Sequence, residues 1–149
     1  MPPVLGYTHI LHFADHNPRS GKNYAGAGAK GFVETSRDVN RTFTLPVKIH
    51  ESGRYVLSLH YTNGNGPINT ENKCAIRTLH IKGGQKLGTF VLPQRGVDEW
   101  SNWGQSNVII ATLPKGEHTL EITFDPENKN MNGAINQAMI ESLQLTRIP

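Results

Sequence analysis

The 149-residue chain has the length of one domain, and its 15 Lys and Arg against 12 Asp and Glu give a net charge of +3. Hydrophobic residues make up 36% of the sequence, and no apolar run reaches the roughly 20 residues of a membrane-spanning helix, which argues against a membrane protein. The positive charge is spread along the chain without a basic cluster, so a nucleic-acid partner is not expected either.

The residues near the start and the cysteine content bear on the compartment. The first residues lack the basic and apolar regions of a signal peptide. Cys74 is the single cysteine, so neither an intramolecular disulfide nor a cysteine-ligated zinc site is expected. We therefore expect an intracellular protein or a module excised from a larger secreted one.

Strand patterns follow one another along the whole chain. Gly and Pro interrupt it at short intervals, and no long apolar pattern has the period of a helix. Strands are predicted at residues 42–49, 54–61, 74–81, 88–92, 107–113, 118–124 and 139–147. Two of these alternate clearly, and their predicted inward residues are Tyr55, Leu57, Leu59 and Tyr61 in one and Leu120, Ile122 and Phe124 in the other. The pattern indicates one all-β domain over residues 1–149, an antiparallel β-sandwich.

Three loops rich in Asn and Gly, residues 17–30, 62–73 and 125–137, separate these strands. Ordering long polar segments costs conformational entropy, so loops of this length usually serve a function. Primary amides donate and accept hydrogen bonds, as sugar hydroxyls do, whereas Asn and Gly are also common turn formers. We expect the last two loops to form one shallow sugar-binding cleft, and the alternative is that they only make turns. The candidate residues are Tyr61, Asn63, Asn65, Asn69, Asn72, Asn132 and Asn136.

The only two tryptophans, Trp100 and Trp103, stand in a polar segment. An indole in such a setting is a platform for the apolar face of a pyranose, or it fills the core instead. Arg95 nearby either binds the carboxylate of a uronic acid or lies on the surface. Asp98 and Glu99 are adjacent and would point apart on an extended segment, which is wrong for the two carboxyls of a glycosidase. No catalytic residues are predicted.

Several motifs, in order along the chain, resemble those of carbohydrate-binding module families 6 and 35. They are His12-Phe13-Ala14-Asp15 and residues 28–33, 52–61, 100–103, 113–120 and 139–145. The resemblance covers nearly the whole chain and implies a galactose-binding-domain-like jelly roll that binds sugar without cleaving it. It implies sugar contacts from Trp100 or Trp103 and from Asn132 or Asn136, with Tyr24 as a second aromatic wall.

The same resemblance implies a structural calcium ion. In the family, acidic side chains of the first and last strands hold it together with backbone carbonyls, and Ca²⁺ accepts such oxygen ligands readily. Phe13 stands where the family has its first acidic ligand. Asp15 and Glu141 are therefore the expected acidic ligands in this chain.

The expected function is binding of an oligo- or polysaccharide. The chain would act as a free-standing lectin, which could form a homo-oligomer, or as an ancillary module of a polysaccharide-degrading enzyme. One alternative is a small glycan-active lyase or hydrolase that uses Glu71, Asp98, Glu99 or histidines brought together by the fold. Another is a structural or protein-interaction β-sandwich.

Overall fold

The computed structural model describes residues 8–22, 24, 26, 30–36, 39–64, 74–96, 99–128 and 137–148. Its elements in chain order are β1 (Thr8–His12), the 3-10 helix η1 (Phe13–Asp15), β2 (Val33–Thr35), β3 (Thr42–Ile49), β4 (Gly53–Thr62), β5 (Cys74–Ile81), β6 (Lys86–Pro93), β7 (Gly104–Gln105), β8 (Ile109–Leu113), β9 (Gly116–Thr123), the 3-10 helix η2 (Pro126–Asn128) and β10 (Ala138–Ile148). Neither helix within these ranges is long and apolar enough to cross a membrane.

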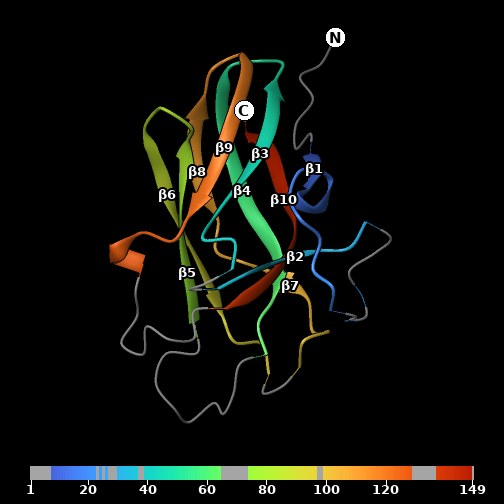
Figure 1. Cartoon of the computed structure of the whole chain (residues 1–149). Coiled ribbons are helices and arrows are strands. Elements are labelled where there is room, and N and C mark those ends of the chain that lie inside the picture. The colour runs from blue at the N-terminus through green and yellow to red at the C-terminus, as the bar shows by residue number, and fades with distance from the viewer. Residues whose placement is uncertain are drawn as a thin grey trace.

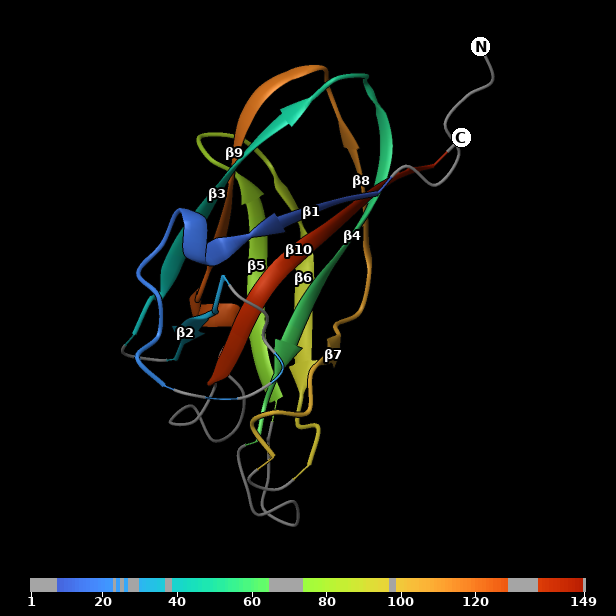
Figure 2. The same ribbon diagram turned by 90° about the vertical axis from the view of Figure 1, so that its right-hand side faces the viewer.

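Two antiparallel sheets form the two layers of the molecule (Figure 1). In the first sheet β10 lies between β1 and β4, β2 also pairs with β10, and both β7 and β8 pair with β4. The second sheet has the order β3, β9, β5, β6. Figure 2 shows β10 and β4 crossing in front of β5 and β6. The all-β sandwich that the alternating sequence predicts is confirmed.

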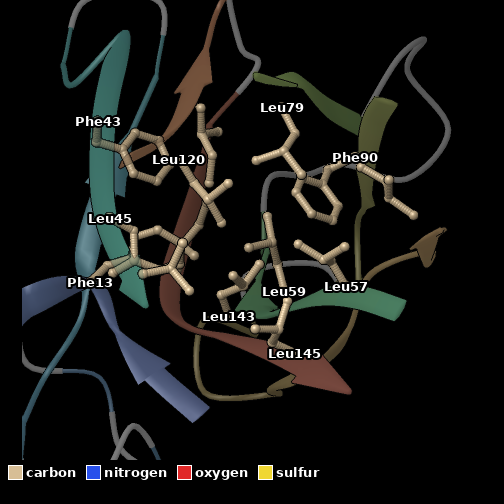
Figure 3. Close-up of a cluster of buried hydrophobic side chains, with 14 of the residues drawn as sticks. Phe13, Phe43, Leu45, Leu57, Leu59, Leu79, Phe90, Leu120, Leu143 and Leu145 are labelled. Atoms are coloured by element: carbon tan, nitrogen blue, oxygen red, sulfur yellow. The ribbon is translucent and has the colours of Figure 1, made fainter. Parts of the chain in front are cut away.

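The space between the sheets holds the hydrophobic core. Leu57 and Leu59 of β4 and Leu120 of β9 are at most 1% exposed, as their alternation predicts. Side chains from both sheets point toward one another in Figure 3. Phe13 of η1 completes the core and meets Phe43 edge-on, with ring centroids 5.3 Å apart. Each such buried side chain contributes about 2 kcal/mol of hydrophobic stabilisation, which is how the sandwich holds together without a disulfide.

The open edge of β6 is covered by a side chain instead of a strand. The Asn107 amide nitrogen donates to the Thr89 carbonyl at 2.9 Å, and its oxygen accepts from the Val91 N–H at 2.7 Å. The carboxamide thereby takes the place of a paired peptide group and satisfies an edge that would otherwise be free. It also fixes the segment between β7 and β8 against the second sheet.

Strand β2 is anchored by a buried arginine. Arg77 on β5 is fully buried, and its Nε donates to the Thr35 hydroxyl at 3.1 Å while the guanidinium lies over the Phe124 ring, 4.8 Å from the centroid. Burial, aided by the like charge of Arg41, lowers the pKa of Arg77 to about 9, so the side chain is still charged at neutral pH. Because β2 follows Phe32 directly, this anchor also positions Phe32.

Several chain segments meet at one end of the sandwich. Thr62 at the end of β4 pairs with Met139 at the start of β10, and β6 ends nearby at Pro93 (Figures 1 and 2). The ends of the two Asn-rich loops therefore emerge side by side, as expected. The loop residues 65–73 and 129–136 lie outside the described residues.

Candidate functional site

Half-buried aromatic side chains gather on the outer face of the first sheet at this end of the molecule. Tyr24 is stacked between Phe32, at 5.8 Å and 15°, and Trp100, at 5.6 Å and 14°. Trp103 meets Phe32 at 5.3 Å and 60°, and all three rings pack on the buried side chains of Phe32 and Met139. We call Tyr24, Trp100 and Trp103 the aromatic cluster. All three are sugar-binding candidates from the sequence, and the fold brings them together.

The orientation of the aromatic cluster follows from strand alternation. On β4, His60 lies between the inward residues Leu59 and Tyr61, so its side chain points outward. The Trp103 ring lies 5.6 Å from the His60 ring and is tilted by 33° to it. Both indoles pack on the separate buried cluster of Phe32 and Met139, on the outer face of the first sheet, and stay partly exposed.

A small polar cavity adjoins the aromatic cluster. Glu99, Trp100, Ser101 and Asn102 line a space of about 380 Å³. An indole beside a carboxylate, a hydroxyl and an amide combines an apolar surface with several hydrogen-bonding groups. This combination suits a ligand that has one apolar face and polar edges, such as a pyranose ring.

The segment that carries both tryptophans is fixed to the end of β4. The Thr62 hydroxyl donates to the Asn102 carbonyl at 3.1 Å and the Glu99 carbonyl at 3.3 Å. Gly64 permits the close approach, because an added Cβ would lie 2.9 Å from the Glu99 nitrogen. Arg95 closes the segment, since its Nε donates to the Asn102 carbonyl at 2.9 Å and the Asn102 amide donates back to the Arg95 carbonyl. The indoles are thus held in place before any ligand arrives.

Two of the predicted sugar-binding side chains make hydrogen bonds within the fold. The Tyr61 hydroxyl donates to the Pro93 carbonyl at 2.7 Å, and the Asn63 amide donates to the Leu92 carbonyl at 3.0 Å. Asn63 is 1% exposed. Both side chains tie the end of β4 to β6. The other amide candidates, Asn65, Asn69, Asn72, Asn132 and Asn136, lie outside the described residues, as do Glu71 and Asp98.

The two expected calcium ligands have separate partners. The Asp15 carboxylate is ion-paired with Lys30 at 3.0 Å, and this ammonium group lowers the pKa of Asp15. The Glu141 carboxylate is 2.7 Å from Nδ1 of His60 and is 13% exposed. No group of three or more His, Cys, Asp or Glu side chains within the described residues is arranged to hold a metal ion.

The segment after η1 is tied to the second sheet by Asn17. The Asn17 amide nitrogen donates to the carbonyls of Phe13, at 3.0 Å, and Thr44, at 2.8 Å. It thus links η1 to β3, and the Phe13 side chain fills the core. Asp15 and Glu141 are each held by a separate partner, Lys30 and His60, among the described residues.

Sequence reasoning missed the base on which the aromatic cluster rests. Phe32, Met139 and His60 are far apart in the sequence, and only the pairing of β10 with both β2 and β4 brings them together. The signal that could have found Phe32 is its place directly before a short β-branched strand, where an aromatic residue usually packs. Met139 carried no comparable signal.

Comparison with known proteins identifies the fold. No protein-family model matches the chain. Among solved structures, the family 35 carbohydrate-binding module of Abf62 from Cellvibrio japonicus is 20% identical with a TM-score of 0.68, and the match covers 96% of this chain and 95% of that one. The chain has the fold of a family 35 carbohydrate-binding module. A second such module, Xyl-CBM35, solved with a glucuronic acid containing disaccharide, is 22% identical with a TM-score of 0.68 over 94% of both chains.

A curated relative matches this chain over one segment of a much longer protein. The cycloisomaltooligosaccharide glucanotransferase of Niallia circulans is 28% identical over 123 residues, which are 83% of this chain and 11% of that enzyme. The chain thus spans about a tenth of the length of this relative. The resemblance to family 35 seen in the sequence motifs is confirmed at the level of the fold.

Proposed function

We propose that the chain binds carbohydrate without cleaving it, as an ancillary module of a larger glycan-active enzyme. The observation that carries the proposal is the aromatic cluster, held half-buried beside a polar cavity on a fold shared with sugar-binding modules. The pyranose would lie with its C–H face on Trp100 and its hydroxyls toward Ser101 and Asn102.

The amide loops supply the rest of the proposed site. The described ends of these loops lie together beside β7, where Thr62 pairs with Met139. Asn65, Asn69, Asn72 and Asn132 or Asn136, which lie outside the described residues, would add amide hydrogen bonds to the same sugar. This arrangement favours a neutral sugar, because amides and hydroxyls match sugar hydroxyls without leaving a charge unpaired.

For the ligand we propose a glucose-based oligosaccharide of the isomalto type. The support is the name of the curated relative, a cycloisomaltooligosaccharide glucanotransferase. We propose that the module itself has no hydrolytic activity. Among the described residues, Glu99 supplies the one carboxylate that lines the cavity beside Trp100. A glycosidase needs two such groups flanking one bond.

We further propose that binding is independent of calcium. The support is the separate pairing of Asp15 with Lys30 and of Glu141 with His60. Addition of a chelator should leave both the sugar affinity and the melting temperature unchanged. A fall in melting temperature on chelation, reversed by added calcium, would show that a metal does bind the native state.

The experiment that tests the function is a calorimetric titration with isomalto- and cello-oligosaccharides, with a sugar-release assay alongside. We expect saturable binding of the isomalto series and no release of sugar. The Trp100→Ala variant should lose this binding, whereas Lys115→Gln, at the far β8–β9 turn, should retain it. Sugar release by the wild-type chain would favour the enzyme alternative, and the absence of any glycan binding would favour a structural sandwich.

A further inference from the structure

The outer face of the first sheet has two ends of different chemistry. Figure 2 shows β10 and β4 of this sheet in front of β5 and β6. The aromatic cluster lies on this face where β4 ends and β10 begins. Where β4 begins and β10 ends, the outward side chains are mostly aliphatic or hydroxylic. Neither the core nor the proposed sugar site uses this second area.

Strand register arranges the side chains of this area in two rows. The first row crosses β1, β10, β4 and β8 through Thr8, Thr146, Val56 and Ile110. The second row holds Ile10, Gln144, Ser58 and the side chain of Gln105, which accepts a hydrogen bond from Ser58 at 2.9 Å. The strand neighbours Leu57, Leu143 and Leu145 are buried in the core, so the residues of the two rows point outward. We call these eight residues, with Val108 directly before β8, the uncharged face.

Exposed aliphatic side chains gather on the uncharged face. Among the described residues four large hydrophobic side chains are exposed, and Ile10, Val108 and Ile110 of this face are three of them, at 51 to 57%. The fourth, Val39, lies between β2 and β3. The hydroxyls of Thr8 and Thr146 hydrogen-bond each other at 2.9 Å, which reduces the cost of removing them from water. Grouped exposure of this kind is typical of a surface that meets a partner.

The outer face of the second sheet is built differently. One of its rows holds Thr44, Glu121, His80 and Lys86, and Lys48 stands opposite Glu117 in another. His80 is also 3.2 Å from the Asp125 carboxylate. The same chain therefore places acidic and basic side chains on a sheet face that meets water. The nine residues of the uncharged face include none, although 18% of the chain is charged.

We infer that the uncharged face is a self-association surface, on which a second copy of this chain packs face to face. Each copy has a net charge of +3, so two copies repel each other in most orientations. Contact through the uncharged face brings no like charges together and buries no unpaired charge. Two such faces are also alike in shape, because outward side chains of β-sheets interdigitate when sheets stack about 10 Å apart. A twofold axis would then place the same residues on both sides of the contact.

The size of the uncharged face sets the strength of the dimer. Strands lie about 4.8 Å apart and side chains on one face about 6.7 Å apart, so the eight positions in the two rows cover roughly 260 Å². With a rim of similar area, each copy would bury about 500 Å², whereas stable dimers bury about 800 Å² per partner. We therefore expect a reversible dimer with a dissociation constant on the order of 0.1 to 1 mM, and not an obligate one.

The test is analytical ultracentrifugation of the chain alone, from about 0.01 to 1 mM. The average mass should rise with concentration from the 16.5 kDa of the monomer toward twice that value. Raising the salt concentration from about 0.05 to 0.5 M should not weaken the dimer, because no ion pair crosses the contact. A monomer at every concentration would overturn the inference, and so would a dimer that dissociates at high salt.

Two substitutions on the face and one outside it locate the contact. Ile110→Lys puts a charge on the uncharged face of both copies and should weaken the dimer at least about tenfold. Ile10→Thr removes aliphatic area without adding charge, and it should weaken the dimer about threefold. Val39→Lys makes the first kind of change at the exposed aliphatic residue outside the face, and it should have less than a twofold effect. Circular dichroism verifies that each variant is folded.

Unchanged self-association in Ile110→Lys, or an equal loss in Val39→Lys, would overturn the inference. The self-association measurement uses no sugar, so it does not depend on the proposed function. The isomalto-oligosaccharide affinity of Ile110→Lys should stay within about threefold of wild type. A wild-type chain that dimerises but binds no glycan would contradict the proposed function alone, and a monomeric chain that binds the sugar would contradict this inference alone.

Discussion

Trp103 and Gly104 are neighbours in the chain, yet they serve two different surfaces. Trp103 reaches outward to Phe32 and His60, in a cluster of stacked rings. Gly104 leaves room on the other side of β7 for the guanidinium of Arg95. One surface offers stacked aromatic rings, and the other offers the positive charge of Arg95 beside Tyr61 and Pro93. Successive residues of an extended segment point to opposite faces, so Trp103 and Gly104 lie against different neighbours at the start of β7.

The two surfaces nevertheless share one support. Asn102 accepts from Arg95 and Thr62 at its carbonyl and returns a hydrogen bond to Arg95 through its amide. The segment that presents the indoles is therefore the one that orients the guanidinium. A substitution in the aromatic cluster should change the sugar affinity alone. A substitution at Asn102 should change both the sugar affinity and the stability of the fold.

The largest expected effect is at Trp100. Trp100→Ala should weaken isomalto-oligosaccharide binding at least about tenfold, or about 1.4 kcal/mol or more, because it removes the stacking surface and the partner of Tyr24. Calorimetry measures the affinity, and circular dichroism verifies the fold. An unchanged affinity would mean that the sugar does not lie on the stacked rings.

Asn107→Ala should destabilise the sandwich by about 1 to 2 kcal/mol. The change removes both hydrogen bonds that close the edge of β6 and leaves the Val91 N–H and the Thr89 carbonyl to water. Urea unfolding measures the loss. Asn107 lines one cavity with Arg95, and neither tryptophan lines it, so the isomalto-oligosaccharide affinity should hold. A fall in isomalto-oligosaccharide affinity would indicate instead that Asn107 lies next to the aromatic cluster.

Asn102→Ala should cost about 1 kcal/mol of stability and weaken isomalto-oligosaccharide binding several-fold. The substitution removes the amide hydrogen bond to the Arg95 carbonyl, so both the indole segment and the guanidinium lose a restraint. Urea unfolding and titration of the variant with the sugar are the measurements. A loss of stability without a loss of affinity would show that the indoles do not need the shared support.

The smallest expected effect lies away from both surfaces, at the Asp15–Lys30 pair. Lys30 lowers the pKa of Asp15, so the pair stabilises the native state above the ordinary pKa of a carboxyl group, about 4, and this contribution is lost as the pH falls through the lowered value. The pair adds more to the free energy of unfolding at about pH 6 than at about pH 3. Lys30→Gln should therefore slightly reduce the difference in free energy of unfolding between these two pH values. Both groups are exposed, so the change is small. Melting curves at the two pH values measure it, and a change in sugar affinity would contradict the separation of this pair from the aromatic cluster.

Long alternating strands were predictable, and short ones were not. Residues 42–49 and 74–81 were predicted with the bounds observed for β3 and β5, because the first alternates over its full length and the second ends at the turn Lys82-Gly83-Gly84-Gln85. β1, β2 and β7 were missed. β2 and β7 have three and two residues, too few for a period to show, and they exist because β10 and β4 offer them partners.

The site shows the same division. Trp100, Trp103 and Tyr24 were recognisable as candidate sugar contacts from residue type and polar setting, and the fold does assemble them. Residue type also suggested Asn63 and Tyr61, and each of these side chains donates a hydrogen bond to a β6 carbonyl. An amide or a phenol has the same chemistry in either role. Only the position of the neighbouring strand decides whether its partner is a ligand or the backbone.

The sequence by itself determined an all-β chain, most of its strands, their inward faces and the aromatic and amide residues available for sugar binding, because these depend on local period and residue chemistry. The tertiary structure alone decided that Glu141 pairs with His60, that Asp15 pairs with Lys30, and that Arg95 lies across β7 from Trp103. These relations join residues whose distance in space is set by strand order and register. Neither quantity is encoded in any local stretch of the chain, so the sequence could name the groups but not their partners.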